Sequence, residues 1–182
     1  MKTKFAILAI AFSFILTLAA CGGDYGTSGY SVDNNYAGES AGFPFGFTAE
    51  DLRGNEVTEA ALGEKELFFV YFWTTWCPSC VRGIPGLAEL AEEFGDRVGF
   101  LSLLGDFGTA RESAITITEN AGAPFITVDA RLGELAGVMG LVGSWFVPTS
   151  IIIDASGNVI GEQIVGAGTD RFRAAIEAAL GG

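Results

Sequence analysis

The chain contains no histidine among its 182 residues, and it contains only three cysteines. Without histidine it cannot build a Ser-His-Asp triad, a Cys-His protease dyad or a histidine-ligated metal site. Positive charge is also scarce, because 10 lysines and arginines stand against 22 aspartates and glutamates, for a formal net charge of −12. This balance lacks the basic footprint of a nucleic-acid-binding protein and gives no electrostatic attraction to anionic lipid.

The N-terminal segment has the parts of a secretory signal peptide. A short basic start precedes an almost entirely apolar stretch from Phe5 to Leu18, which is shorter than a membrane span requires. Small residues follow, in the order Leu18-Ala19-Ala20-Cys21. We therefore predict a signal peptide over residues 1–20.

The Leu-Ala-Ala-Cys order resembles the bacterial lipobox, in which the cysteine becomes the lipidated first residue of the mature protein. The resemblance implies lipidation at Cys21 and a protein outside the cytoplasm, anchored to the cell membrane. Ordinary cleavage after Ala20 would leave a free Cys21 instead, and a lone thiol on a secreted protein is a liability.

The next segment is rich in glycine, serine, aspartate and asparagine and shows no hydrophobic period. We predict that residues 21–42 comprise the lipidated cysteine and a flexible tether. Three tyrosines lie in this segment, at Tyr25, Tyr30 and Tyr36, and the alternative is that they form a binding segment.

Two cysteines lie where a strand passes into a helix. The continuous apolar run Leu67–Phe72 is typical of a strand buried on both faces, and the apolar spacing from Ile84 to Phe94 is helical. Cys77 and Cys80 stand between them, with Pro78 suited to the first helical position. The free N–H groups and positive dipole end of a helix start favour a thiolate, so we expect the pKa of Cys77 to lie below that of a free thiol.

A Cys-x-x-Cys pair in this position indicates an attacking thiol, Cys77, and a resolving thiol, Cys80. Half of a zinc site is a poor alternative, because the chain has no histidine and one other cysteine. A purely structural disulfide is another, although a two-residue spacer at a helix start favours a reducible bond.

The chain from residue 43 onward alternates strand and helix patterns. We predict a hairpin around Gly54-Asn55, a short helical turn at 60–63 and a helix at 77–94 that contains Pro85. Further elements are predicted as strands at 98–104, 124–128, 151–154 and 159–165 and as helices at 109–121, 132–141 and from Thr169 or Asp170, the expected cap, to 180.

The sequence Trp76-Cys77-Pro78-Ser79-Cys80 after an apolar strand resembles the active site of the thioredoxin superfamily, and the segment from about Phe43 to Leu180 resembles proteins of the TlpA/ResA type. The resemblance implies that residues 43–182 form an α/β thioredoxin-like domain. Its sheet would be mixed, with helices on both faces, an N-terminal hairpin and a central insertion. Pro85 agrees with a proline common in this helix, and Val147–Pro148 would be a cis peptide beside the cysteines, rather than a simple strand start.

The resemblance also implies thiol–disulfide exchange that needs no cofactor beyond a redox-active Cys77–Cys80 disulfide. Trp76 would shield the site, Pro78 and Ser79 would support it, and the backbone of Val147 before Pro148 would pair with an extended client. Expected partners are disulfide-containing client proteins and a membrane electron-donor protein, which makes the protein a reductant. The alternatives are a disulfide-forming oxidant, a non-catalytic client-binding lipoprotein and a thiol peroxidase.

Two positions depart from the family pattern. Thioredoxins often carry a buried aspartate six residues before the first cysteine, where this chain has Tyr71. ResA-like proteins often carry a glutamate three residues after the second cysteine, where this chain has Gly83. The sequence shows no carboxylate that obviously replaces either group.

Overall fold

The structure is a computed structural model that describes residues 42–181. The predicted signal peptide, the predicted lipidation of Cys21 and nearly all of the predicted tether lie outside the described residues. Within the described part of the chain, no helix combines the length and the apolar character that crossing a membrane would require.

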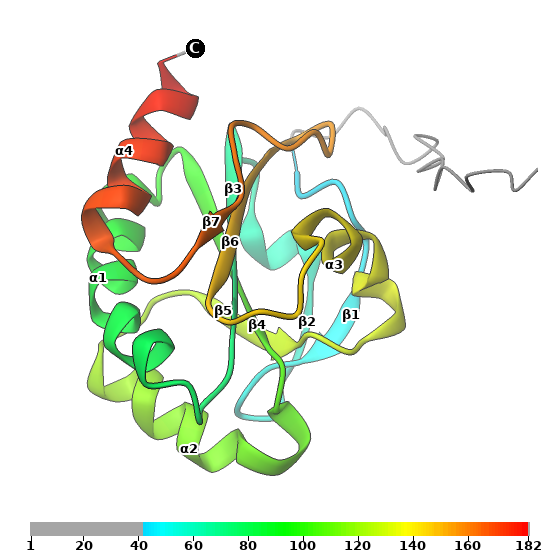
Figure 1. Cartoon of the computed structure of the whole chain (residues 1–182). Helices are drawn as coiled ribbons and strands as arrows, with labels where there is room; N and C mark the ends of the chain where they lie inside the picture. The colour runs from blue at the N-terminus through cyan, green and yellow to red at the C-terminus, as the bar shows by residue number, and fades with distance from the viewer. Residues whose placement is uncertain (1–41, 182) are drawn as a thin grey trace, which may run out of the picture. The chain divides into compact units, whose positions relative to one another are not determined.

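A five-stranded mixed sheet forms the centre of the domain (Figure 1). Its strands lie in the order β5-β4-β3-β6-β7, in which β4 is parallel to β3 and to β5, whereas β6 is antiparallel to β3 and to β7. The strands span β3 Leu67–Trp73, β4 Val98–Leu104, β5 Ile126–Asp129, β6 Thr149–Asp154 and β7 Ile164–Val165.

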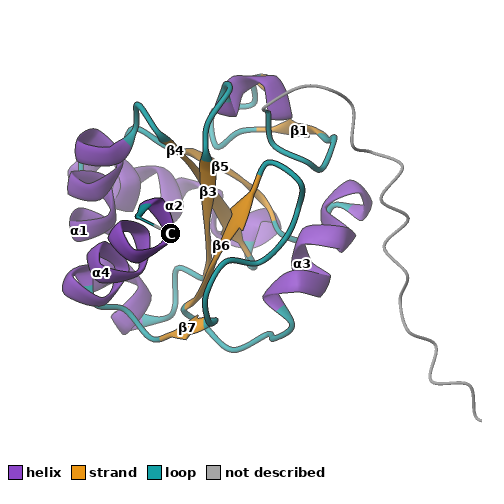
Figure 2. Cartoon of the chain, turned by 90° about the horizontal axis from the view of Figure 1, so that it is seen from above, coloured by secondary structure: helices purple, strands orange, loops and turns teal. Residues whose placement is uncertain are grey.

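Helices cover both faces of the sheet, as Figure 2 shows. One face carries α1 Pro78–Phe94, α2 Phe107–Asn120 and α4 Thr169–Leu180, and the other carries α3 Ala136–Val142. The sheet separates two apolar clusters because alternate residues of each strand point to opposite faces. Phe69, Tyr71 and Trp73 of β3 pack toward α1 and α4, while the residues between them pack toward α3.

An antiparallel hairpin precedes the sheet, with β1 at Thr48–Glu50 and β2 at Glu56–Thr58. A 3₁₀ turn, η2 Glu59–Leu62, then leads toward β3. A second 3₁₀ turn, η3 Gly133–Leu135, comes directly before α3. The predicted fold class is confirmed in its mixed sheet, its helices on both faces and its N-terminal hairpin.

Several predicted boundaries were wrong. The last strand was predicted over 159–165, but β7 contains only Ile164–Val165, and Val159 makes a single bridge to Ile153. The chain between them leaves the strand conformation at Gly161, where φ is 74°. The final helix has Gly168 as its N-cap and no side-chain capping bond, so neither predicted cap, Thr169 nor Asp170, serves in that role.

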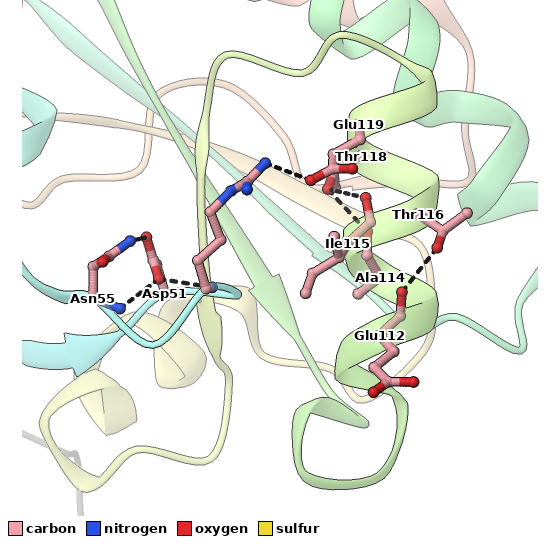
Figure 3. A network of polar contacts seen from close by, with 9 residues as sticks. Asp51, Asn55, Glu112, Ala114, Ile115, Thr116, Thr118 and Glu119 are labelled. Atoms are coloured by element: carbon pink, nitrogen blue, oxygen red, sulfur yellow. Dashed lines mark hydrogen bonds and ion pairs between the residues drawn. The ribbon is translucent and has the colours of Figure 1, made fainter.

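The same five-residue turn closes two loops, at Asp51–Asn55 and at Asp154–Asn158. In each turn one aspartate oxygen accepts the backbone N–H groups of the residues two and four positions on, and the other accepts the asparagine side chain. Each turn has a glycine with positive φ, 85° at Gly54 and 83° at Gly157, which that residue adopts at little cost. Figure 3 shows Asp51 and Asn55 of the first turn and Glu119 of α2, and an ion pair from Arg53 to Glu119 ties this turn to the helix.

We expect the turn at Asp154 to contribute stability that depends on pH. Burial acts to raise the pKa of Asp154, but hydrogen bonds from Asn158 and from backbone N–H groups outweigh it, so the pKa lies below its usual value. A lowered pKa in the folded state gives stability that is present above the unfolded pKa, about 4. That stability is lost as the pH falls through the lower, folded pKa.

The variant Asp154→Asn should therefore reduce the free energy of unfolding by about 1 kcal/mol at pH 7, the size of a typical net hydrogen-bond contribution. The difference from the wild type should shrink as the pH falls below the unfolded-state pKa value of about 4 and vanish once the folded wild-type carboxyl is also neutral. Urea unfolding at several pH values measures both effects. The control is Glu89→Gln, which changes an exposed carboxylate. If the free energy of unfolding depended on pH equally in the two variants, the assignment of this pH dependence to Asp154 would be wrong.

Candidate active site

The two cysteines lie at the junction of β3 and α1, as predicted. Cys77 is the N-cap of α1 with extended backbone angles (φ −93°, ψ 103°), and Pro78 occupies the first helical position. Cys80, in the first turn, forms a disulfide with Cys77, and their Cα atoms are 5.3 Å apart. The sequence placed Cys77 inside the helix, but its extended angles put it one residue before the helix begins.

Several groups surround the sulfur of Cys77. The backbone N–H of Cys80 donates to Cys77 Sγ at 3.2 Å, and the Ser79 hydroxyl lies 3.3 Å from the same atom. The carbonyl oxygen of Val147 lies 3.6 Å away on the other side. Two hydrogen-bond donors at a helix N-terminus are an arrangement that stabilises a thiolate once the disulfide is reduced.

The two cysteines differ in exposure. The Cys77 residue is 5% exposed, whereas Cys80 is fully buried within the cluster between the sheet and α1. A client sulfur can therefore approach Cys77 more readily than Cys80. This asymmetry agrees with an attacking first cysteine and a resolving second one.

The Val147–Pro148 peptide bond is cis, as the resemblance implied. Pro148 is buried, and its carbonyl oxygen accepts the N–H of Gly166 at 2.8 Å. The carbonyl oxygen of Val147, by contrast, faces the sulfur of Cys77. The structure therefore brings the predicted residues Val147 and Pro148 to the cysteines from a segment 70 positions along the chain.

Three large aromatic side chains are exposed on the two segments that meet at Cys77. Trp76 is 70% exposed, and Trp145 and Phe146 are 67% and 76% exposed. The Trp145 ring and the buried Phe72 ring pack edge to face, with centroids 5.5 Å apart. Trp76, which the sequence predicted to shield the site, has most of its surface in solvent.

Asp106 holds the active-site loop, a role that sequence reasoning missed. Its carboxylate accepts the backbone N–H of Thr75 and, at 2.7 Å, the Thr75 hydroxyl. Asp106 stands at the N-cap of α2 but makes no side-chain capping bond there, because its oxygens serve Thr75 instead. An Asp directly before a helix is a usual sequence signal for a cap, so the pattern alone could not indicate this contact.

Tyr71 and Gly83, the two positions without the family carboxylates, meet beneath Cys80. The Tyr71 hydroxyl donates to the Cys80 carbonyl oxygen at 3.0 Å, and the ring is fully buried. Burial raises the pKa of Tyr71 far above that of a free tyrosine, so the phenol stays neutral. Across the described residues, no group of three or more acidic, cysteine or histidine side chains is placed to hold a metal ion.

Comparisons with known proteins agree with this arrangement. The AhpC/TSA family matches residues 43–161. The thiol-disulfide oxidoreductase ResA of Geobacillus kaustophilus is 30% identical over 142 residues, which cover 75% of this chain and 78% of that protein. ResA of Bacillus anthracis is 28% identical over 121 residues, 66% of each chain.

Solved structures show the same fold. A thiol:disulfide interchange protein of the thioredoxin family from Chlorobium tepidum is similar with a TM-score of 0.61 and 26% identity, over 75% of this chain and 94% of that one. The matched segment, the Cys77–Cys80 pair and the thioredoxin-like sheet lead to one assignment. The chain belongs to the AhpC/TSA family and, within it, to the ResA-like thiol-disulfide oxidoreductases.

Proposed function

We propose that the protein is a membrane-anchored, extracytoplasmic oxidoreductase that reduces disulfides of client proteins through Cys77 and Cys80. The observation that carries this proposal is the difference between the two cysteines at the helix start. Cys77 keeps 5% of its surface exposed and has two hydrogen-bond donors beside its sulfur, whereas Cys80 is fully buried.

The exchange has two steps. The Cys77 thiolate attacks one sulfur of the client disulfide, forming a mixed disulfide and releasing the other client sulfur as a thiolate. Cys80, as its thiolate, then attacks Cys77 Sγ, so that the Cys77–Cys80 bond forms and the second client sulfur leaves. The proton lost by Cys80 ends on a client sulfur, and two electrons pass from the protein to the client. A dithiol of a membrane electron-donor protein restores the reduced pair.

The exposed aromatic side chains suit an unfolded client segment. Trp76 stands beside the attacking sulfur, and Trp145 and Phe146 precede the cis peptide that faces it. An extended client chain lying along Val147 can form backbone hydrogen bonds there while its apolar side chains contact these rings. Globular proteins bury such side chains once folded, so this surface favours clients that are incompletely folded.

The location of the protein rests on the sequence before residue 42. The predicted signal peptide, residues 1–20, and lipidation of Cys21 would place the domain outside the cytoplasm on a flexible tether. Disulfides persist in such oxidising compartments, which supplies the clients that the proposal requires.

The full chain carrying Cys80→Ser should accumulate mixed disulfides with its clients, because the resolving thiol is gone. Non-reducing gels of cells that express it should show covalent adducts in the membrane fraction that disappear on reduction. With Cys21→Ser added, the adducts should move to the soluble fraction. The control Cys77→Ser/Cys80→Ser should form none, and adducts that persist in this control would contradict the assignment of Cys77 as the attacking thiol.

A further inference from the structure

Tyr71 lies beside the resolving cysteine, where the exchange mechanism has no carboxylate. The resemblance to thioredoxins and ResA-like proteins leads one to expect an acidic residue at positions 71 and 83, but this chain has Tyr71 and Gly83 there, so neither position gives the resolving cysteine a carboxylate. Tyr71 lies on β3 and Gly83 on α1, and both are buried next to Cys80. Tyr71 and Gly83 are therefore neighbours in space although they lie twelve positions apart in the sequence.

The two residues fit each other. A Cβ atom at position 83 would lie 3.1 Å from the Tyr71 hydroxyl and 2.8 Å from the Cβ of Ala167. Real Cβ atoms almost never approach another heavy atom as closely as 2.8 Å, so the side chains of Tyr71 and Ala167 occupy the space that a residue at 83 would need. Because Gly83 has no side chain, the Tyr71 hydroxyl can occupy the space beside it.

The Tyr71 ring is held in place on its other side. Phe172 of α4 packs against it edge to face, with centroids 5.9 Å apart and planes at 75°. The hydroxyl therefore has a fixed direction, toward the carbonyl oxygen of Cys80. Pro85 lies further along the same helix and has no N–H to donate to the carbonyl of Val81, so α1 lacks one backbone hydrogen bond directly after its first turn.

We propose that Tyr71 is a positioning residue for the resolving step: its hydroxyl, donated to the Cys80 carbonyl, fixes the first turn of α1 so that Cys80 can reach Cys77. The inference rests on the proposed exchange through Cys77 and Cys80 and deepens it. A neutral phenol can orient the resolving cysteine but cannot accept its proton. The proton of Cys80 then passes through solvent to the departing client thiolate, which balances the step without an internal base.

The experiment follows the two steps separately with dithiobis(nitrobenzoate), a disulfide whose coloured thiolate is released once in each step. Reduced protein releases the first equivalent when Cys77 attacks and the second when Cys80 resolves the mixed disulfide. In Tyr71→Phe the first release should keep the wild-type rate, because Cys77 is not contacted by the hydroxyl. The second should be about three- to tenfold slower, the effect of one lost hydrogen bond on a reaction that depends on orientation.

The matched control is Ser102→Ala on the neighbouring strand. It removes another buried side-chain bond, from Trp73 Nε1 to the Ser102 hydroxyl at 2.7 Å, without touching Cys80. The control should lose stability much as Tyr71→Phe does but keep both release rates. A second release in Tyr71→Phe as fast as in Ser102→Ala would show that Tyr71 has only a structural role and would overturn the inference.

The pH profile of the second release is a further readout. In the wild type it should rise through one ionisation, that of Cys80, since the phenol stays neutral, and Tyr71→Phe should show the same profile at lower rates. A second ionisation lost in Tyr71→Phe would contradict a neutral positioning role. If the wild type failed to release even the first equivalent, the proposed exchange itself would be wrong. This result differs from one in which only the role of Tyr71 is wrong.

Discussion

The variant Cys77→Ser should lose thiol–disulfide exchange, with the rate of disulfide reduction falling by on the order of a thousandfold or more. Of the two cysteines only Cys77 has any exposed surface, and the hydrogen bonds from Cys80 N–H and Ser79 favour its thiolate. A serine hydroxyl at the same place is far less acidic than a thiol and does not form disulfides, so the first step has no nucleophile. The buried thiol of Cys80 cannot substitute, because it has no exposed surface.

The measurement is the initial rate of reduction of a model protein disulfide by the pre-reduced variant, with unfolding by urea as a check on folding. Cys80→Ser is the matched control, since it keeps the attacking thiol and should still react once per molecule. Reduction by Cys77→Ser at the wild-type rate would show that this cysteine is not the nucleophile. Peroxide turnover by the wild type that is faster than disulfide reduction would favour the thiol peroxidase alternative.

The variant Gly83→Glu, which introduces the acidic residue that the family resemblance leads one to expect at this position, should destabilise this chain by about 3 kcal/mol or more. Its Cβ would lie 2.8 Å from Ala167 Cβ and 3.1 Å from the Tyr71 hydroxyl, and the carboxylate would be forced into a buried apolar cluster. Overpacking a core costs about 1–3 kcal/mol, and burying an unpaired carboxylate adds to that.

Urea unfolding of Gly83→Ala and Gly140→Ala separates the contact from the helix preference for alanine. Both glycines lie inside helices, but a Cβ at Gly140 meets nothing within 4 Å, so Gly140→Ala should stabilise the protein by about 0.5–1 kcal/mol. Gly83→Ala should destabilise it despite the same propensity gain, and adding Ala167→Gly should restore part of the loss. Equal stabilisation by both alanine variants would contradict the packing described here.

The central strands and the active-site turn could be predicted because the signals that define them are local. The apolar runs of β3 and β4 have every residue buried, so composition alone identifies them. Pro78 and the Cys-x-x-Cys spacing likewise mark the start of α1 within a residue. By contrast, β7 depends on a two-residue pairing with β6, which the apolar pattern of 159–165 does not distinguish from a full strand.

The contacts that Asp106, Tyr71 and Gly83 make around the active site could not be predicted, because each contact joins segments far apart in the chain. Asp106 binds Thr75 instead of capping its own helix, and a cap pattern looks the same in either case. Tyr71 and Gly83 were recognised as departures from the family, but their fit depends on Ala167, a loop residue 84 positions beyond Gly83. Only the packed fold shows that the side chains of Tyr71 and Ala167 occupy the space that a side chain at position 83 would need.

The reduction potential of the Cys77–Cys80 couple tests the proposed function most directly. It is measured on the purified protein by equilibration in defined thiol–disulfide buffers, followed by counting free thiols. The proposed reductant role predicts a value near that of thioredoxin, about −270 mV. A value near about −120 mV, typical of a disulfide-forming oxidant, would contradict that role and reverse the expected direction of electron flow.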